Sequence, residues 1–276
     1  MITGRTLVYG ILADPIAQVR TPAVMNRLFA EQGIDAVVVP FHLAATDLGA
    51  AWPAFSRLRS LGGLIVTVPH KAAVTALCDE VGTAARLVGA ANAVRREADG
   101  RLRCEMFDGR GFVGGLAAQG IGPAGKRVLL LGAGGAAAAI AFALAEAGCA
   151  RVTIANRTAA KAEDLAARVR HAFPDCDAGV GPAEPDGHEL VVNGTSLGLR
   201  PEDPLPLDAE LLRPGMTVAE VVMVPERTAL LDAAERRGCR VHLGHHMLDA
   251  QVRLLADFLV PASTADPAGA ARTRQP

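Results

Sequence analysis

A glycine-rich turn between two apolar segments constrains this chain more than any other feature. Residues 128–137, VLLLGAGGAA, run from a strand-like segment through glycines into an alanine-rich helical segment, and VTIANRT follows at 152–158. Gly132 permits a tight turn, Gly134 lets the backbone approach a ligand, and Ala137 is small enough for a helix to pack closely on a strand. This order of strand, turn, helix and strand predicts a crossover unit that binds a dinucleotide.

The residues of this turn suit the phosphates of a nucleotide. A helix that starts after the glycines offers unpaired N–H groups and the positive end of its dipole to an anion. Glycine-rich turns also occur where no nucleotide binds, so the interpretation depends on the strand–helix–strand context. We predict that five consecutive residues contact the cofactor: Gly132, Ala133, Gly134, Gly135 and Ala136.

The end of the second strand favours one dinucleotide over the other. A site for NAD usually places Asp or Glu here, where the carboxylate accepts a hydrogen bond from the ribose 2′-hydroxyl. This chain has Asn156, Arg157 and Thr158, with Lys161 a turn further on. Arginine can bind a 2′-phosphate through two parallel hydrogen bonds, whereas a carboxylate would repel it. We therefore predict NADP as the cofactor. The alternative cofactor is NAD. Arg157 would then be a solvated surface residue, and Thr158 would only cap a helix over 159–172.

Composition indicates a globular chain with a small-molecule partner. Half of the 276 residues are hydrophobic, and 28 Lys and Arg balance 29 Asp and Glu to a formal net charge of −1. Because there is no basic excess and only 4% of the residues are aromatic, we expect no nucleic-acid partner. No apolar segment is long enough to cross a bilayer and the amino terminus lacks a signal-peptide pattern, so we expect no membrane contact and a cytoplasmic location.

The cysteines and histidines give no metal-binding pattern. The cysteines are odd in number and dispersed, so we expect free thiols that are mostly small core residues. The adjacent His245 and His246 cannot point both rings the same way on a strand, so no metal site is expected there. The five cysteines are Cys78, Cys104, Cys149, Cys176 and Cys239.

Strand-like and helical segments alternate along the chain, which predicts an α/β fold with parallel sheets. The segment 63–69 is apolar on both faces and is expected at the centre of a sheet. Pro22 suits the first turn of a helix over 21–33, with Thr21 as its N-cap. We expect two domains joined near 105–125, with a ligand between them. The other expected strands are 7–13, 36–43, 102–109, 190–196, 217–223 and 240–246; helical patterns cover 46–61 and the segment after 246, and 261–276 is expected to be a disordered tail.

Two ionisable residues follow predicted strands and are candidates for proton transfer. Lys71 lies after the strand 63–69 and before a helical pattern at 72–78. A lysine at the carboxyl end of a strand is well placed as a general acid or base, whereas a cation at a helix start opposes the helix dipole. Asp108 lies at another strand-to-helix junction, where an Asp before Gly is equally typical of a cap or turn.

Several ordered segments resemble the shikimate/quinate dehydrogenase family over residues 7–260. The resemblance implies an α/β fold with an N-terminal substrate domain and a C-terminal Rossmann-type domain. On this basis we expect a substrate-binding and catalytic domain at 1–105, an NADP-binding domain at 106–240, and a helix at 241–260 that returns toward the first domain. The segments are ADPIAQVRTPAVMN (13–26), IVTVPHK (65–71), GAANAV (89–94), FDGRGF (107–112), LGAGGAA (131–137), ANRT (155–158), NGTSLG (193–198) and MLDAQ (247–251).

Members of this family interconvert a ring hydroxyl and a ring ketone by hydride transfer with the nicotinamide. The resemblance implies that Lys71 exchanges the hydroxyl proton, while Asp108 positions Lys71 and balances its charge. Such a pair is chemically reasonable because hydride departure must accompany proton loss. The resemblance also implies that Thr195 and Gly244 contact the cofactor.

Four further residues match substrate-binding positions of the family. The resemblance implies that Thr21, Thr67, Asn92 and Gln251 bind the substrate. Each has an ordinary alternative role. An asparagine at position 92 suits a turn, and Thr67 is a β-branched residue that suits a strand. A glutamine on an apolar helix stripe, as at Gln251, also suits a bond to backbone.

The chain departs from the family at several substrate positions. Apolar residues replace polar groups of the family, and a site built to bond a polar group can discriminate by about 10⁴–10⁵-fold against an analogue lacking it. We therefore expect the substrate to be a ring acid related to shikimate or quinate, with shikimate itself poorly held. Each replacement also suits an ordinary core position. The replacements are Val19, Ile65, Met106, Phe107 and Met223; Arg20, His245 and His246 are candidate carboxylate partners.

Two other functional classes compete with an oxidoreductase of this family. A non-catalytic NADP-responsive binding protein has no need of the Lys71–Asp108 pair. A dehydrogenase of the methylene-tetrahydrofolate type shares the broad architecture but not the FDGRGF segment at 107–112. We expect a monomer or homodimer.

Overall fold

The computed structural model describes residues 2–260, so the predicted tail at 261–276 lies outside the described residues. The chain divides into two compact units, the first comprising 2–107 with 252–260 and the second comprising 108–251. Helix α8 (His245–Leu259) contributes residues to both units. No helix of the described residues is long and apolar enough to span a membrane.

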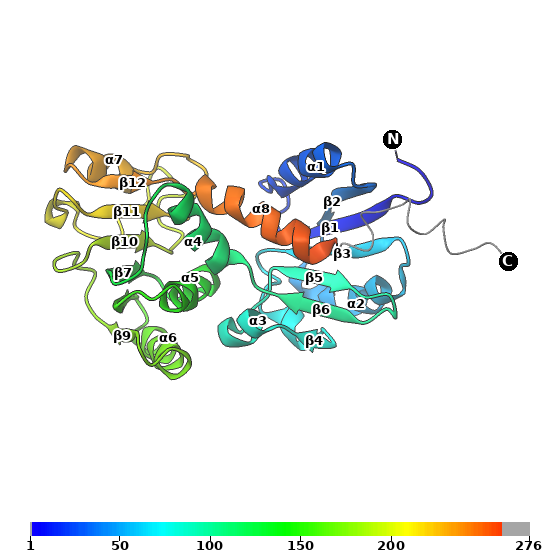
Figure 1. The fold of residues 1–276 in the computed structure, drawn as a ribbon, viewed down its shortest axis with the longest axis horizontal. Helices are drawn as coiled ribbons and strands as arrows, with labels where there is room; N and C mark the ends of the chain where they lie inside the picture. Colours follow the sequence, from blue (N-terminus) through cyan, green and yellow to red (C-terminus); the bar gives the residue numbers. More distant parts are fainter. Residues whose placement is uncertain (1, 261–276) are drawn as a thin grey trace. The chain divides into compact units, whose positions relative to one another are not determined.

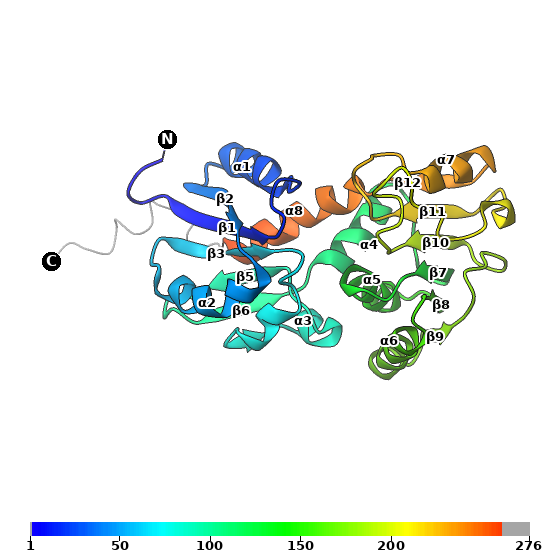
Figure 2. The same ribbon diagram turned by 180° about the vertical axis from the view of Figure 1, so that it is seen from behind.

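The first unit is an α/β layer structure, as predicted (Figures 1 and 2). Its elements are β1 (Leu7–Ala13), α1 (Thr21–Gln32), β2 (Ala36–His42), η1 (Ala45–Asp47), α2 (Leu48–Arg57), β3 (Leu61–Val66), η2 (Ala73–Ala76), β4 (Glu80–Val81), α3 (Thr83–Val88), β5 (Ala93–Arg96) and β6 (Leu102–Glu105).

The sheet of the first unit is mixed, so the prediction of parallel sheets was wrong for this half. The strand order is β2-β1-β3-β5-β6-β4, and β3 lies inside the sheet, as its apolar faces predicted. β1 pairs in parallel with β2 and β3, but β5 is antiparallel to both β3 and β6. The connection 67–92 contains η2, β4 and α3, and it returns the chain beside β3 in the opposite direction.

Two local helix predictions in this unit need correction. Helix α1 begins at Thr21, and the N-cap is Arg20 with no side-chain cap bond, so Thr21 is not the cap. Strand β3 ends at Val66, and only one short 3₁₀ turn, η2, forms after Lys71. A single turn has almost no aligned dipole, so the helix-dipole argument about Lys71 does not apply.

Tyr9 anchors the end of α8 in the first unit. Its ring is buried on β1, and its hydroxyl donates a hydrogen bond of 3.1 Å to the Leu259 carbonyl. Burial raises the pKa of Tyr9 from 10.0 to about 12, with the charge of Arg95 acting the other way. The buried neutral phenol therefore links the sheet to the helix.

Since the folded pKa lies above the unfolded value, the stability that the Tyr9 phenol contributes is complete below pH 10 and is lost as the pH rises toward 12. We expect phenolate absorbance to appear only near pH 12 while circular dichroism still reports folded protein. The chain has one tyrosine, so the signal is unambiguous, and Tyr9→Phe is the blank. Titration near pH 10 in the folded protein would contradict this assignment.

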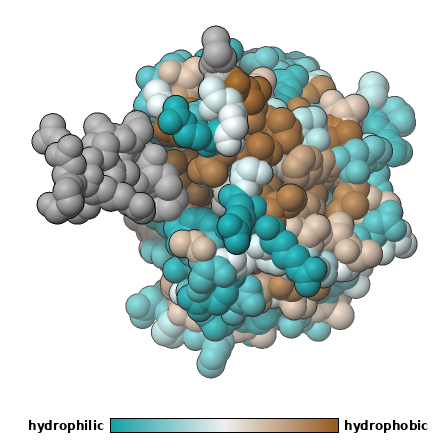
Figure 3. All heavy atoms as spheres, turned by 90° about the vertical axis from the view of Figure 1, so that its right-hand side faces the viewer, coloured by the Kyte–Doolittle hydropathy of each residue, from teal (hydrophilic) through white to brown (hydrophobic). Residues whose placement is uncertain are grey.

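Figure 3 shows the end of the first unit from which β1 starts, where hydrophobic residues lie among hydrophilic ones. Strand β1 runs away from this side of the unit, and β3 runs parallel to it, so the carboxyl ends of both strands lie on the opposite side (Figure 1). Ligands of open α/β sheets bind outside the carboxyl ends of the strands. The candidate site of this unit therefore belongs to the opposite edge of the sheet.

The second unit consists of a parallel sheet covered by helices. Its strands are paired only in parallel, in the order β12-β11-β10-β7-β8-β9, so the chain turns from one half of the sheet to the other between β7 and β10. This is the Rossmann order. Its elements are α4 (Asp108–Ala118), β7 (Arg127–Leu131), α5 (Gly135–Glu146), β8 (Arg151–Ala155), α6 (Ala159–Ala172), β9 (Asp177–Val180), β10 (Leu190–Asn193), η3 (Ala209–Leu211), β11 (Thr217–Glu220), α7 (Ala229–Arg236) and β12 (Arg240–His242).

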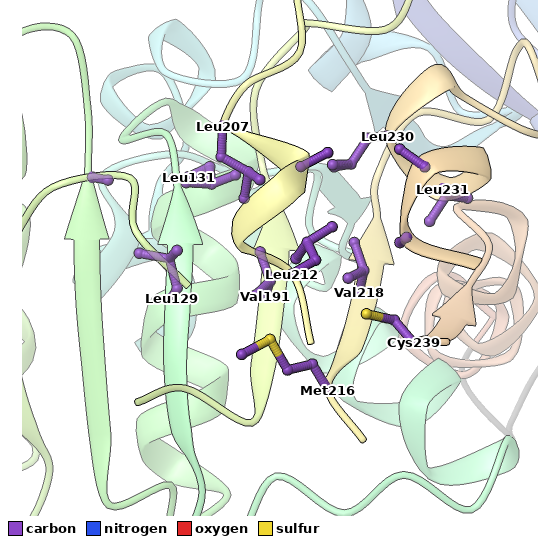
Figure 4. Packing of buried hydrophobic residues seen from close by; sticks show 14 residues of the cluster. Leu129, Leu131, Val191, Leu207, Leu212, Met216, Val218, Leu230, Leu231 and Cys239 are labelled. Carbon is purple, nitrogen blue, oxygen red and sulfur yellow. The ribbon is translucent and has the colours of Figure 1, made fainter. Parts of the chain in front are cut away.

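The core of the second unit explains why its strands read as apolar runs. Leu129, Val191 and Val218 come from three neighbouring strands and pack with Leu212 and Leu230 in one buried cluster (Figure 4). Helix α5 lies by β7 and β8, α6 lies by β8 and β9, and α7 lies by β11 and β12 (Figures 1 and 2). Because helices cover both faces, inward-facing and outward-facing strand residues are both apolar.

Candidate active site

Three chain segments of the first unit meet at the carboxyl edge of β3. Ile65 pairs with Ala93 across the antiparallel β3–β5 contact, and Ala93 pairs with Glu105 on β6. The residues just beyond these pairs are Thr67 after β3, Asn92 before β5, and the segment 106–107 after β6. The register thus brings residues that are far apart in sequence to one edge.

Hydrogen bonds fix this edge. The Ala91 N–H donates to the Lys71 carbonyl at 2.8 Å, and the Asn92 N–H donates to the Glu105 carbonyl at 3.1 Å. The Asn92 Oδ1 accepts from the Phe107 N–H at 2.9 Å. The backbones of Lys71 and Phe107 therefore both contact the segment 91–92. The amide of Asn92, which is buried, satisfies part of this turn, as the alternative for that residue predicted.

The apolar replacements at family substrate positions fall into two groups. Ile65, Met106 and Phe107 are buried in the core, and the Phe107 ring packs 5.3 Å from the Phe258 ring. Val19 is half-buried and Met223 is exposed. Three of the five replacements thus contribute to packing in this structure.

Asp108 and Gln251 form a buried polar pair in the second unit. Asp108 is the first residue of α4 and is 3% exposed, and Gln251 on α8 is 8% exposed. The Gln251 Nε2 donates to the Asp108 Oδ1 at 2.7 Å. An acidic residue in the first turn of a helix is favoured by the helix dipole. The amide of Gln251 therefore bonds to a carboxylate side chain, not to backbone, and it holds one oxygen of Asp108 in place.

A glycine allows Gln251 to approach α4. A Cβ atom at Gly111 would lie 2.8 Å from the Gln251 Cβ and 3.1 Å from the Met247 carbonyl oxygen. We expect Gly111→Ala to displace α8 at this point and to lower kcat by about 10- to 100-fold, because small misplacements of positioned groups are costly.

The matched control for this change lies on the same helix. A Cβ atom at Gly114 would lie 3.2 Å from the Ala250 Cβ, so Gly114→Ala tests helix packing without pressing on Gln251. Steady-state rates and thermal unfolding of both variants separate the two effects. Equal losses of kcat in both variants would contradict the role given to Gly111.

The glycine turn of the second unit has an open phosphate-binding geometry. Gly132 follows β7 with a φ of 108°, a conformation that favours glycine, and Gly134 is the N-cap of α5 with no side-chain cap bond. A Cβ atom at Gly134 or Gly135 would meet no other atom within 4 Å, and both residues are exposed. The start of this twelve-residue helix is therefore accessible, and its first N–H groups suit a diphosphate.

Ala137 is buried where the sequence predicted a small residue. A Cβ atom on Gly194 would lie 2.9 Å from the Ala137 Cβ, so the loop after β10 packs tightly on the start of α5. Ala133 and Ala136 are half-buried beside it.

A pocket of about 440 Å³ lies next to this turn, outside the carboxyl ends of β7, β8, β9 and β10. It is at the point where the strand order turns, which is where dinucleotides bind in this fold. Gly132, Asn156, Arg157 and Thr195, all predicted as cofactor residues, line it. The remaining lining residues are Leu131, Ala155, Gly181, Pro182, Ala183, Ser196, Leu197 and Pro206.

The end of β8 presents its cation to solvent. Arg157 is exposed, and Asn156 Nδ2 donates to the Thr158 carbonyl at 2.9 Å, which closes the turn. Thr158 is the N-cap of α6, but its hydroxyl makes no cap bond. Lys161, exposed on the first turn of α6, does not line the pocket.

Gly244 has a packing reason to be glycine. A Cβ atom there would lie 2.2 Å from the Val222 carbonyl oxygen.

The three candidate partners for a substrate carboxylate lie in different surroundings. Arg20 is exposed, whereas the ring centroids of His245 and His246 lie 4.3 Å apart at the start of α8. His245 Nδ1 also lies 3.7 Å from the Glu226 carboxylate.

Sequence reasoning missed part of the pocket wall. The loop 181–183 follows β9, whose sequence DAGV carries no clear strand pattern, and Pro206 lies in an irregular loop. Ser196 and Leu197 are within the quoted NGTSLG segment, and their place in that loop is the signal that could have identified them.

Comparisons with known proteins agree with this architecture. A family model described as shikimate dehydrogenase substrate binding domain matches residues 11–94, and one described as shikimate / quinate 5-dehydrogenase matches residues 116–176. A relative from Rubrobacter xylanophilus, named shikimate dehydrogenase (NADP(+)), is 41% identical over 256 residues, which is 90% of this chain and 88% of the relative.

Solved structures share the fold over nearly the whole chain. Shikimate 5-dehydrogenase from Listeria monocytogenes, in complex with shikimate and NAD, is 31% identical, with a TM-score of 0.87 and 96% of both chains covered. The 5-ketofructose reductase of Gluconobacter sp. strain CHM43 is 32% identical, with a TM-score of 0.85 over 95% of this chain and 98% of that chain. This chain belongs to the shikimate/quinate dehydrogenase family.

Proposed function

We propose that this chain is an NADP-dependent oxidoreductase that transfers hydride between the nicotinamide and a ring hydroxyl or ketone of a shikimate- or quinate-like hydroxy acid. The observation that carries this proposal is the hydrogen-bonded edge of the first unit. Lys71 and Phe107 both bond to the segment 91–92, and Asp108 follows Phe107 directly. Lys71 and Asp108 thus each adjoin a segment fixed by hydrogen bonds, which supports the roles in proton transfer that the family resemblance implies for them.

NADP fits the residues around the pocket. The exposed start of α5 would hold the diphosphate, because its N–H groups have no side-chain cap. Arg157 would hold the 2′-phosphate, since it lines the pocket and no acidic residue does. Lys161, Thr158, Thr195 and Gly244 remain proposed contacts. When bound, NADP supplies a nicotinamide ring that accepts or donates the hydride.

Lys71 moves the proton that accompanies the hydride. In oxidation its neutral Nζ accepts the hydroxyl proton of the substrate, and in reduction its ammonium returns that proton to the carbonyl oxygen. Asp108 holds and orients Lys71 and balances its charge, and Gln251 in turn holds Asp108. The buried setting of the Asp108–Gln251 pair strengthens these electrostatic contacts.

Thr21, Thr67, Asn92 and Gln251 would bind the hydroxyl and carboxylate groups of the substrate. The Val19 side chain cannot donate a hydrogen bond, so the chain has fewer side-chain donors for a carboxylate than the family commonly has. One compared structure is a reductase of 5-ketofructose, a neutral sugar ketone. These two observations favour a second candidate, a neutral polyhydroxy ketone, over shikimate itself.

The test is a substrate panel with both cofactors. We expect NADP⁺ with an alicyclic hydroxy acid, or NADPH with a ring or sugar ketone, to change absorbance at the reduced-nicotinamide band. The panel contains shikimate, quinate and 5-ketofructose, each with NADP(H) and NAD(H). NADPH binding in a calorimeter with no turnover over the whole panel would overturn the proposal and favour the non-catalytic binding protein.

We propose further that the enzyme works in the cytoplasm as a monomer or homodimer. Its cysteines support a reducing compartment, because all five are free thiols and four of them are buried. Membership of the shikimate/quinate dehydrogenase family leaves no support for the folate-type alternative.

A further inference from the structure

We propose that Glu220 is a positioning residue for the nucleotide pocket and that its carboxylate sets the shape of the loop 194–197. This inference rests on the proposed binding of NADP in that pocket. Glu220 ends β11, has no exposed surface, and is not part of the proposed chemistry.

Neutral donors from three elements converge on this carboxylate. The Asn193 Nδ2, at the end of β10, lies 3.0 Å from both carboxylate oxygens. The Thr228 hydroxyl, at the start of α7, donates at 3.0 Å. The backbone N–H groups of Val221 and Val222 donate at 2.9 and 3.1 Å. One buried side chain thus connects the ends of two strands and a helix.

These donors compensate for burial. Burial raises the pKa of Glu220, and its hydrogen bonds with Asn193, Val222, Thr228 and Val221 act the other way. Every partner named above donates, so the arrangement suits an ionised carboxylate that only accepts. Because the Glu220 carboxylate only accepts hydrogen bonds, the NH₂ end of the Asn193 amide must face it.

The orientation of Asn193 then determines the loop. With Nδ2 facing Glu220, the Asn193 Oδ1 accepts from the Thr195 N–H at 3.1 Å and from the Thr195 hydroxyl at 2.7 Å. The Thr195 hydroxyl accepts from the Leu197 N–H at 3.0 Å, and the Asn193 Nδ2 also donates to the Leu197 carbonyl at 2.9 Å. These bonds fold the loop 194–197 around one amide.

The loop is a wall of the pocket and rests on the glycine turn. Thr195 and Leu197 line the pocket. A Cβ atom on Gly132 would lie 3.1 Å from the Gly194 carbonyl oxygen, so loop and turn are in close contact. A displaced loop would therefore change the space for the nucleotide.

Stability alone does not require a carboxylate at this position. Any side chain that satisfies the surrounding buried donors would serve stability, since the cost arises when a buried donor is left without a partner. A positioning role makes a different demand, because only an acceptor keeps the Asn193 amide in the orientation that bonds Thr195. The two roles predict different results for variants of the same cluster.

The experiment measures NADP⁺ affinity by calorimetry, so it does not depend on turnover. We expect Glu220→Gln to raise the Kd for NADP⁺ by at least about 10-fold, because its amide presents a donor to Asn193. The matched control is Thr228→Val, which removes one donor to the same carboxylate and the cap bond from the Leu231 N–H, but keeps the Thr228 methyl group that lies by Gly198. It should lower the melting temperature but leave the Kd within about twofold, because neither of the lost bonds involves the Asn193 amide or the loop 194–197.

A second variant covers the case in which Glu220→Gln does not fold. Glu220→Asp keeps the charge but is one methylene shorter, so it draws back from Asn193, and we expect the same rise in Kd. An unchanged Kd in a folded variant, an equal rise in Thr228→Val, or the failure of both Glu220 variants to fold would overturn the positioning role. A wild-type chain that binds no NADP⁺ would instead overturn the proposed function.

Discussion

Lys71→Ala is expected to lower kcat by about 10²–10⁴-fold, the range that a positioned general acid or base contributes. The substrate hydroxyl would then lose the group that accepts its proton as the hydride leaves. The Kd for NADP⁺ should stay unchanged, because the pocket at the glycine turn is lined only by residues of the second unit, whereas Lys71 is in the first. Steady-state rates and calorimetry on the same preparation measure the two quantities.

The control for this prediction is another lysine. Lys126 precedes β7, at the amino end of that strand, and does not line the pocket. Lys126→Ala should retain both kcat and cofactor affinity. Unchanged turnover in Lys71→Ala, or loss of NADP⁺ binding together with turnover, would refute proton transfer by Lys71.

Arg157→Asp is expected to lower kcat/KM for NADP⁺ by about 100-fold and to leave kcat/KM for NAD⁺ nearly unchanged or improved. A charge-assisted hydrogen bond contributes about 1.5–3 kcal/mol, and the new carboxylate would also repel the 2′-phosphate. The same carboxylate can accept from the 2′-hydroxyl of NAD. The ratio of the two kcat/KM values is the measurement.

Arg213→Asp provides the matched charge reversal. Arg213 is exposed in the same unit and does not line the pocket, so its replacement should leave the ratio unaltered. A parallel fall for both cofactors in Arg157→Asp would mean that Arg157 does not select the 2′-phosphate.

The nucleotide half of the fold could be predicted because its signals are local. Gly132, Ala137 and the apolar runs on either side lie within a short stretch, and the helix over 159–172 was predicted with its observed bounds. Strand direction is not a local property. The residues Ala93–Arg96 of β5 end in two arginines and show no alternation, so neither the strand nor its antiparallel pairing could be predicted.

The candidate site could be predicted only residue by residue. Asp108 and Gln251 were each singled out, but their mutual hydrogen bond joins positions 143 residues apart and follows from the packing of α4 on α8. Glu220 was missed because a single charged residue at the end of a strand is usually solvated, and only the tertiary structure shows that donors surround it. An apolar residue in a motif gives no indication of whether it faces a ligand or the core. The sequence therefore could not show that Ile65, Met106 and Phe107 are buried in the core.

We propose that Lys71 and Asp108 act together on the substrate proton while NADP is bound. The most direct test is a crystal structure of the chain with NADP⁺ and the best substrate of the panel. The claim predicts the Lys71 Nζ within about 2.6–3.2 Å of both the reacting substrate oxygen and an Asp108 carboxylate oxygen. A ternary complex in which the reacting oxygen contacts neither residue would contradict it.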